Sequence, residues 1–323
     1  MASEAPAMSP QSIGALVKQT FRLYGRRFWL FFGLAAIAFV PSQVVSAMFQ
    51  LQVQGLAQGA ANRDIISLFV GFFIWFSLIL AISLLLFALL QMALIRAVSE
   101  SYQMRNAGIA WLYRFALGRL GTLAGAWSLV GLVFLGLAIP MMVGGFLFLL
   151  GLVSLVISAV DPFLLEQLGV PATVLKTGLP LGLFGALGVI GSLVAATSLL
   201  AAIYFAVRWW FIPQAVVQER AGIRSSISRS SSLVRGSWWR SYGAIFLFGL
   251  LSGAGSLTGT ALVGLLLSGR EPAALIIRGL FEGIIQAIAS PIFVLGTTLF
   301  YYDLRVRKEG YNMEVMAQEL ARA

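Results

Sequence analysis

The sequence predicts an all-α, polytopic membrane protein with six transmembrane helices. Of its 323 residues, 59% are hydrophobic and only 11% are charged, whereas about a quarter of the residues of a soluble domain are charged. Six stretches of at least about 20 residues, the length of a membrane-spanning helix, contain no Asp, Glu, Lys or Arg. So few polar side chains cannot cover so much apolar surface, and we therefore expect lipid to cover it.

These stretches divide the chain into three parts. A cytoplasmic N-terminal segment, 1–27, and a cytoplasmic C-terminal tail, 306–323, flank a transmembrane domain at 28–305. The approximate spans are 28–52, 66–95, 120–143, 181–207, 242–267 and 283–303. The first span ends near 52 because the stretch becomes polar there, with four glutamines between positions 50 and 58.

The third apolar stretch is too long for a single straight crossing. It contains Pro140 and the pair Gly144 and Gly145, which favour a kinked helix with an extension beyond the membrane. The alternative is a re-entrant segment at 145–160, which would need protein around its irregular backbone. Both interpretations stay open at this stage.

The distribution of basic residues predicts the orientation. When the six spans are taken as crossings, 18 of the 22 Lys and Arg residues fall on one side, and the side rich in Lys and Arg is the cytoplasmic one. Both termini are therefore expected in the cytoplasm. The net charge of +10 follows from this topology and from attraction to anionic lipid, so no nucleic-acid partner is needed to explain it.

Three segments with similar patterns precede the first, third and fifth spans. Residues 12–27 place apolar side chains on one helical face and basic side chains elsewhere, which is typical of an amphipathic helix at the membrane surface. Residues 107–119 and 222–240 have a comparable layout. The sequence thus favours three parallel repeats, near 12–105, 107–218 and 222–310, each with an interfacial helix followed by a transmembrane hairpin.

The basic segments are candidates for contact with anionic lipid or a protein partner. Segment 219–240 interleaves arginines with seven serines and a Trp pair, which would bring guanidinium groups and hydroxyls to the level of lipid phosphates. A solvated loop anchored by interfacial tryptophans is the plainer interpretation. The residues predicted to make these contacts are Arg224, Arg229, Arg235, Arg240, Arg26 and Arg27.

Uncharged polar residues inside the spans are candidates for lining a cavity. Gln43, Gln91 and Gln286 lie within or close to kinked helices, where a substrate cavity could form. The alternative is that they bond to neighbouring helices and only hold the bundle together.

The composition excludes several kinds of catalytic site. The chain has no His and no Cys, which removes the usual zinc, haem and iron–sulfur ligands and every Ser-His-Asp or Cys-His arrangement. We expect no cofactor, no metal and no enzymatic activity.

The C-terminal run YYDLRVRKEGYNMEVMAQEL at 301–320 resembles the ending of a prokaryotic family, the membrane domain of glycerophosphoryl diester phosphodiesterases. The run SIGALVKQTFRLYGRRFW at 12–29 and the run IPQAVVQERAGIRSSISRSSSLVRGSWWR at 212–240 are similar to its other two recurring blocks. The resemblance implies a helical bundle in the cytoplasmic membrane of a prokaryote, without the catalytic barrel to which the family is sometimes fused.

Two hypotheses for function follow. The first is a non-catalytic integral membrane protein that serves as a scaffold, a partner subunit or a lipid-contacting module. The second is a transporter or translocator of a lipid-like or phosphate-bearing small molecule.

Overall fold

The described part of the chain is almost entirely helical. The computed structural model describes residues 10–59, 65–103, 107–159, 181–269 and 271–311, and no strand occurs in these ranges. The helices are α1 (Ile13–Arg26), α2 (Phe28–Gly59), α3 (Ile65–Tyr102), α4 (Ile109–Ala159), α7 (Leu181–Arg208), α8 (Ile212–Gln218), α9 (Ile223–Val234), α10 (Trp238–Leu266) and α11 (Pro272–Glu309). Six of these helices are long and apolar enough to cross a membrane, namely α2, α3, α4, α7, α10 and α11. The predicted fold class is confirmed.

The chain forms two compact units. Unit 1 contains residues 1–126 and 210–323, and unit 2 contains residues 127–209, so that α4 belongs to both.

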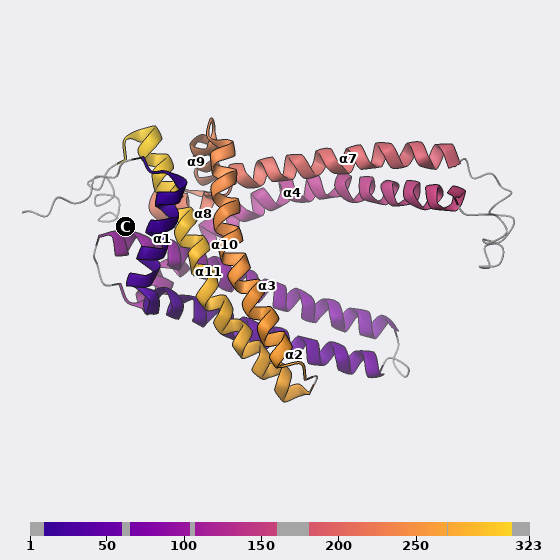
Figure 1. Ribbon diagram of the computed structural model, residues 1–323, viewed down its shortest axis with the longest axis horizontal. Helices are drawn as coiled ribbons and strands as arrows, with labels where there is room; N and C mark the ends of the chain where they lie inside the picture. Colours follow the sequence, from indigo (N-terminus) through magenta and orange to yellow (C-terminus); the bar gives the residue numbers. More distant parts are fainter. Residues whose placement is uncertain (1–9, 60–64, 104–106, 160–180, 270, 312–323) are drawn as a thin grey trace, which may run out of the picture. The chain divides into compact units, whose positions relative to one another are not determined.

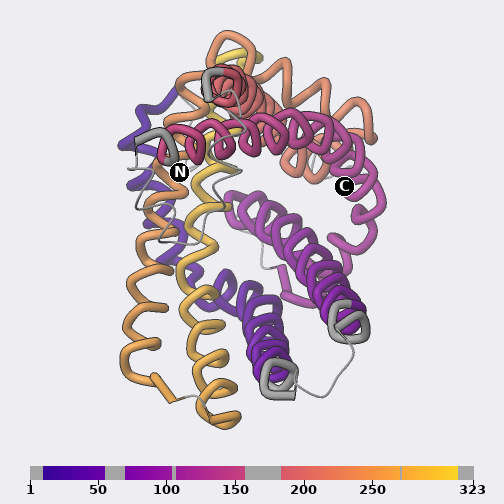
Figure 2. Tube along the Cα trace, turned by 90° about the vertical axis from the view of Figure 1, so that its right-hand side faces the viewer, coloured from indigo at the N-terminus to yellow at the C-terminus, as the bar shows by residue number. Residues whose placement is uncertain are grey.

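Helix α11 is the central element of unit 1. It packs against α1, α2, α3, α9 and α10, and every residue from Val294 to Arg305 is buried. Figure 2 shows α10 and α11 running side by side. Pro272 is well placed at the start of α11, where its missing N–H costs no hydrogen bond, and Gly310 ends the helix in the left-handed region at φ 62°.

Two glycines bring α11 into close contact with α2. A Cβ atom at Gly279 would lie 3.0 Å from the carbonyl oxygen of Gln43, and one at Gly283 would lie 2.7 Å from the Cα of Val40. Small residues of this kind allow helix backbones to approach each other in a membrane. Larger side chains at either position would force the two helices apart.

Pro291 changes the hydrogen bonding in the middle of α11. Its ring cannot donate to the carbonyl of Ala287, and a proline in a helix also bends the turn before it. Two neighbouring carbonyls accept bonds from other helices. The hydroxyl of Tyr24 donates to the oxygen of Ile288 at 2.7 Å, and that of Ser252 donates to the oxygen of Ala289 at 3.0 Å.

Helix α1 packs on α11 through part of its apolar face. Ser12 caps it by accepting the N–H of Ala15 at 3.2 Å. Leu16, Thr20 and Tyr24, which follow one another at intervals of four residues, are buried. Phe21 belongs to the same predicted apolar face and remains 45% exposed, so this face is divided between protein contact and an exposed surface.

Unit 2 is a helical hairpin held by glycines. In Figure 1, the part of α4 that belongs to this unit runs beside α7. A Cβ at Gly144 would lie 2.6 Å from the carbonyl oxygen of Gly191, and one at Gly151 would lie 2.5 Å from the Cα of Gly188. The two backbones therefore touch at two levels, seven residues apart on α4.

Several helices extend beyond the expected spans, and one expected alternative does not occur. The re-entrant alternative is excluded for residues 145–159, because α4 continues as one helix through Pro140 to Ala159. Residues 109–119 are the first turns of α4 and not a separate helix, unlike α1 and α9. Helix α3 extends to Tyr102 and α11 to Glu309, so the expected tail at 306 begins inside a helix.

Candidate functional site

A cavity lies between α2, α3, α10 and α11 of unit 1. Its volume is about 410 Å³, within the range of small-molecule sites. All of its lining residues belong to helix segments long and apolar enough to cross a membrane. The residues around it are Phe39, Phe87, Leu90, Gln91, Leu94, Gly249, Ser252, Gly253, Ser256, Leu257, Gln286, Ser290, Phe293 and Val294.

The sequence of α10 explains why space remains there. Gly249 and Gly253 have no side chain, and a Cβ at Gly253 would meet no atom within 4 Å. Ser252 and Ser256 are also small and lie four residues apart, so they lie on one face of the helix. This stripe of small residues leaves a hollow opposite Gln91 of α3 and Gln286 of α11.

The polar atoms of the cavity are only partly paired. The hydroxyl of Ser256 donates to Oε1 of Gln286 at 3.2 Å, and the hydroxyl of Ser252 donates to a backbone carbonyl of α11. Oε1 of Gln91 and Oγ of Ser290 are buried and have no hydrogen-bond partner. Gln91 is only 7% exposed. A buried amide oxygen without a partner is energetically costly, so the cavity contains polar groups that a bound molecule could satisfy.

Gln43, the third predicted cavity residue, lies elsewhere. It borders a small space of about 10 Å³ together with Arg278 and Glu282, where its backbone meets α11 at Gly279. Arg278 donates to Glu282 at 2.8 Å, because residues four apart lie on the same face of a helix. The structure thus brings two of the three predicted glutamines together and leaves the third apart.

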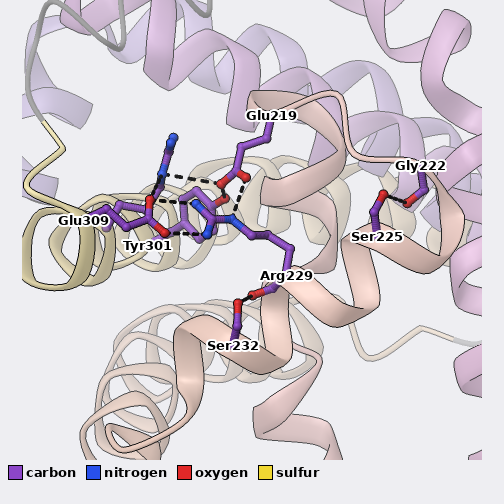
Figure 3. Close-up of polar contacts among 8 residues, drawn as sticks. Glu219, Gly222, Ser225, Arg229, Ser232, Tyr301 and Glu309 are labelled. Atoms are coloured by element: carbon purple, nitrogen blue, oxygen red, sulfur yellow. Dashed lines mark hydrogen bonds and ion pairs between the residues drawn. The ribbon is translucent and has the colours of Figure 1, made fainter.

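A second polar cluster joins the loop before α9 to the end of α11 (Figure 3). Arg229 of α9 donates through Nε to Glu219 at 2.6 Å and through a terminal nitrogen to Glu309 at 2.7 Å. The hydroxyl of Tyr301 donates to Glu219, and Arg305 pairs with both acids, at 3.4 Å to Glu219 and 3.2 Å to Glu309. Tyr301, Arg305 and Glu309 follow at intervals of four residues and so share one face of α11.

The electrostatics of this cluster keep Arg229 charged. Burial alone would lower the pKa of Arg229, but its hydrogen bonds to Glu309 and Glu219 more than offset this effect and raise the pKa above its usual value. Two arginines face two glutamates, so the cluster is neutral. These ion pairs join α9 and the loop before it to the C-terminal end of α11, which indicates a structural role.

A third cluster holds the start of the chain to α11. Asp303 accepts the backbone N–H of Gln11 at 2.7 Å and hydrogen bonds from Arg240 at 2.8 Å and Arg307 at 2.9 Å. The same two arginines also donate to the carbonyl oxygen of Gln11. Of the two arginines that follow Asp303 on α11, Arg307 pairs with it, whereas Arg305 pairs with Glu219 and Glu309.

The predicted lipid-contacting arginines divide into two groups. Arg229 and Arg240 are engaged with acidic side chains of α11 and the loop before α9. Arg224, Arg235 and Arg26 are exposed. Arg26 borders a surface cavity of about 460 Å³ at the junction of α1 and α2, which Arg27 and Trp29 also line.

A buried ion pair in α3 was not anticipated. Arg96 contacts Glu100 at 2.8 Å, and the two side chains are 2% and 5% exposed. The guanidinium group also lies 5.5 Å from the ring centroid of Trp111 and 4.8 Å from that of Phe115, within the range of cation–π attraction. The spacing of four residues could have indicated the pair, but its burial could not be read from the sequence.

Ser252 and Ser256 were also missed as cavity residues. Their spacing of four, interleaved with Gly249 and Gly253, was the available signal.

Within the ranges that the structure describes, no group of three or more carboxylates is placed to hold a metal ion. Comparison of the chain with protein family models, curated proteins and solved structures finds no match.

Proposed function

We propose that the protein is a non-catalytic integral membrane protein that holds a lipid-like molecule in the cavity between α2, α3, α10 and α11. The observation that carries this proposal is that Gln91 and Gln286, from two different helices, line one cavity of about 410 Å³ inside the apolar helix segments. A bundle held together only by interhelical contacts would need no such space.

The rim of the cavity supports a ligand that comes from the bilayer. Leu257 is 74% exposed and Phe87 is 45% exposed, and both lie on segments expected to face hydrocarbon. A molecule with an apolar tail can therefore keep the tail among lipids while its polar end reaches the glutamines. This is the behaviour expected of a lipid-contacting module.

Translocation of the bound molecule is the second candidate function. It is favoured by Pro291, which lies between the lining residues Ser290 and Phe293 and interrupts the hydrogen-bond ladder of α11 at that point. A lipid-flipping assay in vesicles would separate translocation from binding alone.

The environment is proposed from the charge distribution and the sequence resemblance. We place the protein in the cytoplasmic membrane of a prokaryote with both termini in the cytoplasm, as a member of the family of the membrane domain of glycerophosphoryl diester phosphodiesterases. The exposed side chains of Arg224, Arg235 and Arg26 support contact with anionic lipid head groups on that side.

Filling the cavity tests the proposed function. Gly253→Leu places a side chain where no atom lies within 4 Å of the new Cβ, and Gly243→Leu is a matched control on the same helix, equally free of close neighbours and outside the cavity. After purification in mild detergent, native mass spectrometry should find a bound lipid-like molecule on the parent protein and on Gly243→Leu. Its occupancy should fall at least fivefold on Gly253→Leu. Equal retention by all three proteins would refute the proposal.

A further inference from the structure

The side chains around the α2–α3–α10–α11 cavity restrict the chemistry of its ligand. None of the lining residues is Asp, Glu, Lys or Arg. A phosphate or ammonium group placed there would lose its hydration without meeting an opposite charge, which is strongly unfavourable in an apolar environment. The same groups would be accommodated easily at a cavity lined by arginines, such as the one that Arg26 and Arg27 border.

The hydrogen-bonding capacity of the cavity points to a hydroxyl group. Oε1 of Gln91 is buried without a donor, and Oγ of Ser290 is buried without a partner of either kind. A hydroxyl both donates and accepts, so a rotation of the Gln91 or Ser290 side chain toward the cavity would let a ligand hydroxyl satisfy its orphan atom. The hydroxyls of Ser252 and Ser256 and Oε1 of Gln286 already bond within the protein.

The size and the rim of the cavity point to a lipid. A volume of about 410 Å³ corresponds to roughly 14 water molecules at about 30 Å³ each, which is enough for a head group and the first carbons of its chains but not for long acyl chains. Those chains must leave past Phe87 and Leu257, which are exposed and apolar. A free polyol would gain nothing from that apolar rim.

We propose that the cavity between α2, α3, α10 and α11 binds an uncharged lipid with a hydroxyl-bearing head, of the diacylglycerol class, through Gln91 and Ser290. This inference rests on the proposed function, because it specifies the lipid that the cavity holds. It excludes from this cavity the phosphate-bearing substrates that the sequence left open.

The test uses lipid analogues with identical tails. The full-length protein is reconstituted in phosphatidylcholine vesicles with a photoactivatable analogue of diacylglycerol or of phosphatidic acid, each carrying a diazirine on one acyl chain. Crosslinked peptides are identified by mass spectrometry. The diacylglycerol analogue should label the α3 and α10 segments around the cavity at least fivefold more than the phosphatidic acid analogue. Unlabelled dioleoylglycerol should compete for this labelling, and free glycerol should not.

Substitution of Gln91 gives a second readout. Gln91→Leu removes the unpartnered acceptor and should lower labelling by the diacylglycerol analogue about two- to tenfold, the effect of one neutral hydrogen bond. Without added diacylglycerol, the same variant should unfold at an equal or higher temperature, because a buried unpaired amide is destabilising. Gln52→Leu, at an exposed position of α2 outside the cavity, should change neither measurement.

The possible outcomes distinguish the proposed head-group chemistry from lipid binding in the cavity as such. Equal labelling of the cavity by both analogues would overturn the uncharged head group and leave lipid binding intact, as long as Gly253→Leu abolishes both signals. Competition by free glycerol would overturn the lipid and leave the hydroxyl recognition. Labelling that is insensitive to both Gly253→Leu and Gln91→Leu would overturn the proposed function itself. A lower unfolding temperature for Gln91→Leu would show a structural role for this residue and would refute its role in binding.

Discussion

Removal of the charge of Asp303 should release α1 from α11. The Asp303 side chain is 2% exposed and accepts one backbone N–H of the N-terminal segment and hydrogen bonds from Arg240 and Arg307. Asp303→Asn keeps the shape of the side chain and one acceptor oxygen. It turns the other oxygen into an amide donor that faces two arginines.

The size of the expected change in the free energy of α1 opening depends on which interactions of Asp303 are lost when α1 leaves α11. The ion pairs of Asp303 join α10 to α11 and one turn of α11 to the next, so opening of α1 does not break them. It breaks the hydrogen bond from Gln11 to the carboxylate, and a hydrogen bond to a charged group contributes about 1.5–3 kcal/mol. Arg240 and Arg307 are 30% and 35% exposed, so water can solvate them once the carboxylate is lost. Because Asp303→Asn still offers one acceptor oxygen to the N–H of Gln11, we expect the lower end, about 1.5 kcal/mol, which corresponds to roughly a 10-fold increase in the opening equilibrium of α1.

A buried thiol can report this opening. Because the chain has no cysteine, Thr20→Cys introduces a single thiol at a position of α1 that is fully buried. Its reaction with a maleimide in mild detergent requires α1 to leave α11. The rate should rise by up to about 10-fold when Asp303→Asn is added, by the same free-energy conversion.

The control removes the same charge from the other end of α11. Glu271 precedes α11 and makes no side-chain capping bond, so Glu271→Gln should leave the labelling rate unchanged. A rate for Thr20→Cys with Asp303→Asn that stays within about twofold of the Thr20→Cys parent would show that this cluster does not hold α1, and the reasoning would be refuted.

Three further predictions concern other parts of the molecule. Arg229→Lys keeps the charge but loses the planar guanidinium group that reaches both Glu219 and Glu309. It should lower the free energy of unfolding in detergent by about 2 kcal/mol. SDS titration followed by circular dichroism measures this change, and an unchanged midpoint would contradict the prediction. Gly144→Leu should separate the hairpin of unit 2, whereas Gly145→Leu, where a Cβ meets no atom, should not; equal thermal stability of the two variants would count against the glycine contact. Reporter fusions at position 170 and at the C-terminus should lie in opposite compartments, and a shared compartment would overturn the topology.

The six membrane-spanning helices could be predicted because apolar length is a strong signal, but their ends could not. The predicted spans stopped at charged residues, and α3 was ended before Arg96. In the structure, Arg96 and Glu100 neutralise each other four residues apart and stay buried within the helix. A charge therefore does not mark the end of a helix when it can pair with a charge one turn further along the same helix.

The cavity could be predicted in part. Uncharged polar residues in a membrane helix favour contact with protein or with a cavity, and this argument selected Gln91 and Gln286, which both line the cavity. It selected Gln43 for the same reason, but α2 lies so close to Gly279 of α11 that a space of only about 10 Å³ remains there. Whether such a polar residue lines a cavity depends on the distance between the two helix backbones. Small residues on the facing helix determine this distance.

The long-range polar clusters lay beyond the reach of sequence periodicity. Tyr301 and Glu219 are separated by 82 positions, and Gln11 and Asp303 by 292. What the sequence did contain was the spacing of four between Asp303 and Arg307. This spacing places the two side chains on one face of α11 but gives no indication of which segment they bind.

Helix α11 links these features into one element. Its C-terminal turns carry the two charge clusters that hold α1 and α9, and an earlier part of the same helix lines the cavity through Gln286 and Ser290. Between them, Tyr24 of α1 donates to the carbonyl of Ile288, two residues before Ser290. Burial raises the pKa of Tyr24 to about 12, so its hydroxyl remains a donor throughout the neutral range. The N-terminal part of the chain therefore bonds to α11 at two places: through Tyr24 beside the cavity, and through Gln11 at the charged C-terminal end of α11. The position of α1 thus fixes the segment of α11 on which lipid binding would depend.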